Sequence, residues 1–110
     1  MKTLKSLRRL HNTKIIGDLQ HGECRLHGHR IISWDDLCIH ISLCGWDTVT
    51  TRRRINQALS ALGSKASVYH TKGECFLYDP VRKTSVLMDD AYAMYTLEND
   101  TYVCPERKEQ

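Results

Sequence analysis

Apolar residues recur at helical spacing along residues 49–62, and polar side chains take the positions between them. The apolar stripe consists of Ile55, Ala58, Leu59 and Leu62. Asp47, Thr48 or Thr50 can accept hydrogen bonds from the free amides at a helix start, and Gly63 suits the left-handed residue that often follows a helix end. The pattern therefore predicts an amphipathic helix over 49–62.

After this helix the pattern changes to the period of a β-strand. Residues 66–78 are rich in β-branched and aromatic residues on both sides of Lys72 and Gly73, which predicts a β-hairpin with its turn at that glycine. A shorter hairpin is expected within 23–33, where a glycine again suits a tight turn, and 84–88 suggests another short strand.

Residues 37–44 are compatible with two secondary structures. Ser33 followed by Asp36 resembles a helix capping box, and Gly45 suits the end of a helix, so these signals favour a helix. The same stretch also alternates strictly between Leu or Ile and smaller or polar residues, which is typical of a half-buried strand. The strand is therefore kept as an alternative.

Length and composition predict a single domain, and the expected helices and strands make it an α+β domain. A chain of 110 residues that is 41% hydrophobic can bury a core. We expect a basic arm or short helix at 1–12, one globular domain at 13–104 and a frayed tail at 105–110. Within the domain, 89–97 fits a short capped helix or an extended segment.

The sequence shows no sign of a membrane span or an exported protein. No apolar run approaches the ~20 residues that cross a bilayer, and the first ten residues lack the apolar centre of a secretory signal. Five irregularly spaced cysteines do not suggest a disulfide framework, so we expect reduced thiols, several of them buried. These features predict a cytoplasmic protein without membrane contact.

Charge is segregated along the chain although the net charge is only +3. Residues 1–30 and 49–83 each hold seven Lys or Arg against two acids, whereas 31–48 and 84–104 hold three and four acids without Lys or Arg. If these blocks stay apart in space, the molecule has a basic side that suits a polyanion. The alternative is that folding intermixes the blocks.

The predicted helix carries the side chains most often used on nucleic acids, and no acid lies between residues 49 and 62. Arginines, amides and hydroxyls there, together with two lysines nearby, form the candidate binding set. The set is Thr50, Arg52, Arg53, Arg54, Asn56, Gln57, Lys65 and Lys72. The competing interpretation is a solvated or protein-binding face. Trp46 is expected to anchor the preceding turn in the core rather than to stack on bases.

The order of expected elements resembles the winged helix-turn-helix family of DNA-binding domains over residues 30–79. The resemblance implies that helix 49–62 enters the major groove of double-stranded DNA and that the tip of hairpin 66–78 contacts the backbone as a wing. Thr51 stands where the compact form of that family has an apolar core residue. This departure leaves a different α+β fold, with 37–44 as a strand, as the alternative.

Other chemistry has less support. His21, Cys24, His27 and His29 are possible zinc ligands, but the usual second close pair is missing, so no metal is assigned. Neither a phosphate-binding glycine loop nor a nucleophile motif is present, and we expect neither a cofactor nor catalysis.

Two functions from different classes remain. The first is a small DNA-binding protein, a transcription or replication regulator, with a possible homodimer through 91–97. The second is a protein that binds and inhibits a host or defence protein; in size and charge segregation the chain resembles small phage-encoded accessory proteins. Salt-dependent duplex binding would distinguish the two.

Overall fold

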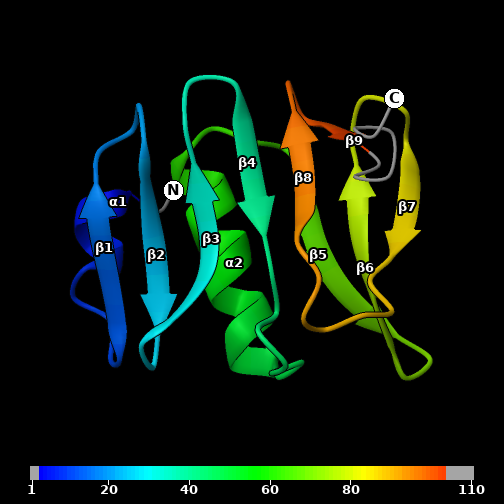
Figure 1. Cartoon of the computed structure of the whole chain (residues 1–110), viewed down its shortest axis with the longest axis horizontal. Helices are drawn as coiled ribbons and strands as arrows, with labels where there is room; N and C mark the ends of the chain where they lie inside the picture. The colour runs from blue at the N-terminus through cyan, green and yellow to red at the C-terminus, as the bar shows by residue number, and fades with distance from the viewer. Residues whose placement is uncertain (1–2, 104–110) are drawn as a thin grey trace.

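The computed structural model describes residues 3–103 (Figure 1), and within them nine strands form two antiparallel sheets with two helices beside them. The helices are α1 (Leu4–Leu7) and α2 (Val49–Ala61). The strands are β1 (Thr13–Gly17), β2 (Gly22–Leu26), β3 (His29–Trp34), β4 (Cys38–Ile41), β5 (Ser67–Thr71), β6 (Glu74–Asp79), β7 (Thr84–Leu87), β8 (Tyr95–Glu98) and β9 (Thr101–Val103). The larger sheet has the order β1-β2-β3-β4-β8-β9, and the smaller sheet has the order β5-β6-β7.

This mostly β architecture contradicts the expected winged helix-turn-helix fold, because no helix precedes α2 where the supporting helix of that family should lie. The stretch 37–44 contains strand β4, which pairs with β3 on one side and β8 on the other. The carboxylate of Asp35 accepts hydrogen bonds from the backbone N–H of Leu37 and of Cys38, both at 2.8 Å. An aspartate side chain can close a turn in this way as readily as it caps a helix.

The predicted amphipathic helix is confirmed as α2. Thr48 is its N-cap, and the Thr48 hydroxyl accepts a hydrogen bond from the Thr51 N–H. Gly63 has a φ of +82°, as expected of the residue after a helix end. Ile55 and Leu59 are fully buried. Thr51 is buried beside them although its side chain is polar and was not part of the predicted apolar stripe.

Both predicted hairpins are present. His27 and Gly28 connect β2 to β3, and Lys72 and Gly73 connect β5 to β6. Each pair has positive φ at both residues, which is the two-residue turn whose twist matches that of the flanking strands. The predicted strand at 84–88 is β7, and the ambiguous stretch 89–97 contributes the start of strand β8 instead of a helix.

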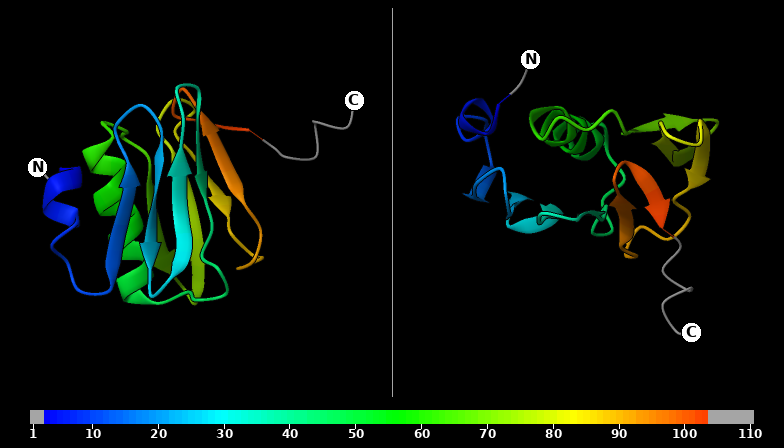
Figure 2. Two further views of the ribbon diagram at one scale, coloured as in Figure 1. Left: turned by 60° about the vertical axis from the view of Figure 1, so that its left-hand side comes forward. Right: turned by 90° about the horizontal axis from the view of Figure 1, so that it is seen from above.

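The main core lies between the larger sheet and the helices. Seen from above, α1 and α2 lie on the same side of strands β1 to β3, and the smaller sheet lies beside α2 (Figure 2). The buried row across the larger sheet consists of Ile15, Cys24, Ile32, Ile41 and Tyr95, which are register partners on one face. Cys24 and Cys75 are buried, in agreement with the expectation of buried thiols.

Asp79 connects the two sheets. Its side chain is fully buried at the end of β6 and accepts hydrogen bonds at 2.9 Å from the backbone N–H of Val81, Arg82 and Tyr102. Burial of the carboxylate raises its pKa, but these three hydrogen bonds outweigh burial and hold the pKa below its ordinary value. Since Tyr102 belongs to β9, this charged group joins the smaller sheet to the larger one. The expected tail at 105–110 lies outside the described residues.

Candidate functional site

Several polar residues of α2 bind other parts of the protein. Arg52 forms an ion pair with Asp47. The Arg54 Nε donates to the Thr13 hydroxyl of β1 at 2.9 Å, and its Nη1 donates to the Gln57 side-chain oxygen at 3.1 Å. These contacts hold α2 against the loop before it and against β1.

Asn56 fastens α2 to the smaller sheet. Its Nδ2 donates to the Val68 carbonyl at 2.8 Å, and its Oδ1 accepts from the Val68 N–H at 2.7 Å. Val68 belongs to β5, which is an edge strand of that sheet. The Asn56 amide therefore satisfies edge groups that a neighbouring strand would otherwise pair, and its side chain serves the fold.

The remaining predicted binding residues are exposed at three separate places. Thr50 and Arg53 lie on the outer side of α2, Lys65 precedes β5, and Lys72 is at the β5–β6 turn. Arg52, Arg53, Asn56 and Gln57 line a shallow groove of about 430 Å³ between α2 and β5. The structure thus brings half of the predicted set to one groove, and their contact with DNA stays a prediction.

The smaller sheet has an open face that carries aromatic side chains. Tyr69 of β5, Phe76 of β6 and Leu87 of β7 are register partners on this face, opposite the buried Leu77. The Tyr69 and Phe76 rings are stacked, with centroids 5.5 Å apart and planes inclined by 18°. Tyr69 is 38% exposed, and its hydroxyl lies 2.6 Å from that of Ser85.

Cations flank both ends of this aromatic face. Lys72 is exposed at the β5–β6 turn, and Arg82 and Lys83 are exposed at the β6–β7 turn. Between residues 65 and 88 the acids are Asp79, which is buried, and the exposed Glu74. The sequence analysis missed the face, although alternation placed Tyr69, Phe76 and Tyr78 outward; those aromatics were counted there as evidence for strands alone.

The four possible zinc ligands are not brought together. His21 is in the turn between β1 and β2, whereas His27 and His29 are at the opposite end of β2. Cys24 is fully buried, and burial raises the pKa of its thiol to about 11. Among residues 3–103, no group of three or more His, Cys, Asp or Glu side chains is arranged to hold a metal ion.

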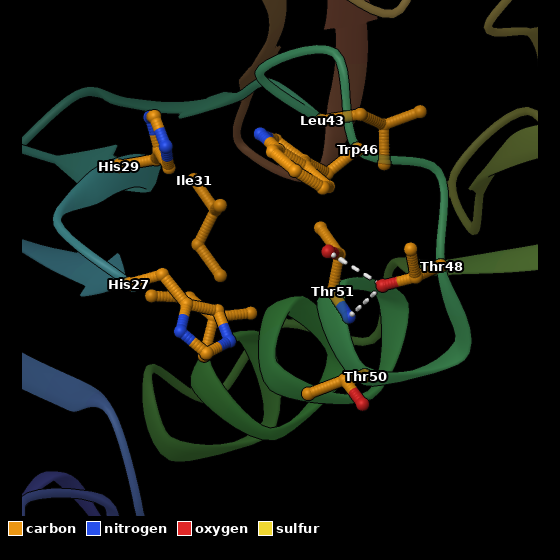
Figure 3. A pocket seen from close by; sticks show the side chains of 9 residues that line it. His27, His29, Ile31, Leu43, Trp46, Thr48, Thr50 and Thr51 are labelled. Carbon is orange, nitrogen blue, oxygen red and sulfur yellow. Dashed lines mark hydrogen bonds between the residues drawn. The ribbon is translucent and has the colours of Figure 1, made fainter.

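Trp46 is not the core anchor that the sequence suggested, because 58% of its surface is exposed. It stands at the mouth of a pocket of about 550 Å³ between the β2–β3 turn, the β4–α2 loop and the start of α2 (Figure 3). Leu26, Ile31 and Leu43 provide apolar walls. The ring of His29 faces Trp46 with centroids 6.2 Å apart.

The segment 91–97, expected as a dimer contact, is only partly available. Tyr95 is buried within the larger sheet, whereas Tyr92 is highly exposed and its ring lies against Gly45. Gly45 has a φ of +80°, a conformation that favours glycine, and a Cβ atom there would also make the Tyr92 ring shift. No helix in the described part of the chain is long and apolar enough to cross a bilayer.

The sequence was compared with models of protein families. The model described as Kyanoviridae Gp96 protein matches residues 2–101, nearly the whole chain. The chain belongs to the Kyanoviridae Gp96 family. It is therefore a small phage-encoded protein, as its size and charge pattern suggested. The comparisons with curated proteins and with solved structures each gave no match.

The match to the Gp96 family gives no support to the winged helix-turn-helix resemblance. The structure contradicts that resemblance, because the fold is built on two β-sheets. Its surface offers two features that differ in chemistry: the aromatic face of β5–β7 with its cations, and the apolar pocket at Trp46.

Proposed function

We propose that this phage protein binds single-stranded nucleic acid on the open face of the β5–β7 sheet. The observation that carries the proposal is the stack of exposed Tyr69 on half-buried Phe76, with cations at both ends of the strands. Bases of a single strand stack on exposed aromatic rings while Lys and Arg contact the phosphates. The proposal retains nucleic acid, the partner expected from the basic segment 49–83. It moves the main contact from helix α2 to the sheet that contains the β5–β6 hairpin.

An unpaired strand suits this face better than a duplex. A flat sheet presents rings to the faces of bases, which are available only when the bases are unpaired. Groove reading would need the polar side chains of α2, but Arg52, Arg54 and Asn56 are bonded within the protein. Six residues of β6 span ~20 Å at ~3.3 Å each, enough for a strand of a few nucleotides between the two cationic turns.

The test is fluorescence anisotropy of a labelled oligothymidine of ~12 nucleotides at ~50 and ~200 mM salt, with a duplex of equal length for comparison. We expect Tyr69→Ala to weaken single-strand binding about 5–150-fold, the loss of one stacked base. The duplex should bind more weakly than the single strand.

The matched control is Tyr92→Ala, which removes an exposed tyrosine that lies against Gly45, away from this face. It should leave the affinity unchanged. Absence of single-strand binding by the native protein at ~50 mM salt, or equal affinities for native protein and Tyr69→Ala, would refute the proposal.

A further inference from the structure

The pocket at Trp46 has the character of a protein-binding pocket. Its inner walls are Leu26, Ile31 and Leu43, and Trp46 stands at its mouth with most of its surface in solvent (Figure 3). None of the described residues that line it is acidic, and its polar groups are threonine hydroxyls and two histidines. Exposed tryptophans beside apolar cavities are the residues that dominate the energy of protein interfaces.

A second, smaller recess adjoins this pocket and shares Leu43 with it. The recess has a volume of about 230 Å³ and lies between the β4–α2 loop, the β5–β6 turn and the segment after β7. Its apolar lining includes Leu87 and Met88, and its carboxylates belong to Asp47, Glu74 and Asp89. An apolar floor with carboxylates around it matches a Lys or Arg side chain, whose stem is apolar and whose end is charged.

We propose that these two recesses together dock one segment of a partner protein that carries a large apolar side chain close to a lysine or arginine. The apolar side chain enters the pocket beside Trp46, and the cationic one enters the recess beside Glu74 and Asp89. Leu43 lies between them and contacts both. This surface meets the aromatic face of β5–β7 only at an edge, where Leu87 belongs to both, and it adds a second partner to the nucleic acid.

Charge decides between a protein and a nucleic acid at this end of the molecule. A phosphate backbone that reached Trp46 from the Lys72 turn would pass Glu74 and Asp89, and like charges repel. A cationic segment of a protein is attracted by the same carboxylates. The Asp47 side chain contributes less because it is already paired with Arg52.

The experiment uses a set of N-acetylated nonapeptides in a glycine and serine background, each with one phenylalanine and one arginine separated by none to three residues. Binding is followed by the indole N–H signals in ¹H–¹⁵N NMR spectra of the full chain. The protein has two tryptophans, and the Trp34 indole donates to the Asp18 carbonyl inside the fold. The Trp46 signal should shift on binding while the Trp34 signal stays in place.

At least one peptide should shift the Trp46 signal in a saturable manner. Replacing its phenylalanine by alanine should weaken binding about tenfold, and replacing its arginine by glutamine about threefold. Trp46→Ala should abolish binding, which in this variant is followed by the backbone amide signals of His29 and Leu43 in the same spectra. Glu74→Gln with Asp89→Asn should remove the preference for arginine. Single-strand binding should be unchanged in Trp46→Ala and should not weaken when the Glu74 and Asp89 carboxylates are neutralised, which separates this proposal from the previous one.

Two control variants match these changes at the other end of the fold. Leu37→Ala removes an apolar side chain that is 70% exposed, and Glu98→Gln removes an exposed carboxylate of β8. Both should bind the peptides as the native protein does. The proposal is overturned if no peptide shifts the Trp46 signal at ~2 mM, or if peptides with and without arginine bind equally well.

Discussion

Helix α2 and the β5–β7 sheet are neighbours in a basic part of the chain, yet they use their polar residues differently. In α2, Arg52, Arg54 and Asn56 bind elements of the same protein. In the sheet, Lys72, Arg82 and Lys83 are exposed at turns. The helix packs between other elements, so its flanking side chains reach neighbours; the outer face of the sheet meets solvent. A charged side chain is therefore available to a partner only where the fold leaves it exposed.

The largest effect is expected at Asp79, which holds the sheet in place. Asp79→Ala should lower the free energy of unfolding by about 3 kcal/mol, because three backbone N–H groups lose a charged acceptor. Urea denaturation measures this, with the exposed Asp36→Ala as the control.

The stability of the protein at low pH should depend on the same Asp79 carboxylate. The folded pKa of Asp79 is below the unfolded value of ~3.9, so its stabilisation is present above that pH and is lost as pH falls through the folded pKa. The stability of native protein should decline below pH ~4 more steeply than that of Asp79→Asn. If stability falls with pH equally in the native protein and in Asp79→Asn, the Asp79 carboxylate is not ionised when it accepts these hydrogen bonds.

Asn56 tests whether α2 uses its polar face for folding. Asn56→Ala removes both bonds to Val68 and should cost about 2 kcal/mol of stability in urea denaturation. The folded variant should bind the oligothymidine as the native protein does. Ser60→Ala, on the same helix, is the control. A loss of binding with unchanged stability would reverse our interpretation of this helix.

The lysines at the turns should affect nucleic-acid binding and leave stability unchanged, in contrast to Asn56. Lys72→Gln and Lys83→Gln should each reduce the slope of log affinity against log salt by ~0.7, the value for one single-strand phosphate contact. Their unfolding free energies should change by less than ~0.5 kcal/mol, since both side chains are exposed. Anisotropy at several salt concentrations measures the slope. Unchanged slopes in both variants would remove these turns from the binding surface.

The smallest effects on stability are expected at two adjacent arginines of α2, one bonded within the protein and one exposed. Arg54→Ala should cost about 1 kcal/mol, because its bonds to Thr13 and Gln57 are lost. Arg53→Ala, at an exposed position, should change stability by less than ~0.5 kcal/mol. Thermal unfolding of the two variants side by side checks the difference. Equal losses would mean that exposure does not separate their roles.

Elements with local signals were predictable from the sequence. Helix α2 has its cap, apolar stripe and terminal glycine within sixteen consecutive residues, from Thr48 to Gly63. The two hairpins each have a glycine at a turn that requires positive φ. Such features act between residues close in the chain, so the chain alone is enough to recognise them.

The candidate site was predictable only in part. Exposed Lys72 and the hairpin that carries it were identified from the sequence, whereas the roles of Arg54 and Asn56 depend on Thr13 and Val68, which are distant along the chain. The Trp46 pocket is assembled from β2, β3 and the start of α2, so no single stretch of sequence could reveal it.

Residues 37–44 show most clearly what the sequence determined and what tertiary structure decided. Their local pattern allowed a helix or a strand, and a single segment has no means of choosing between the two. Strand β4 forms because β3 pairs with one edge and β8, more than fifty residues later, pairs with the other. The sequence determined which residues are apolar and where turns can form. The tertiary structure decided between the alternatives, because a strand is stable only when its partner strands satisfy its backbone.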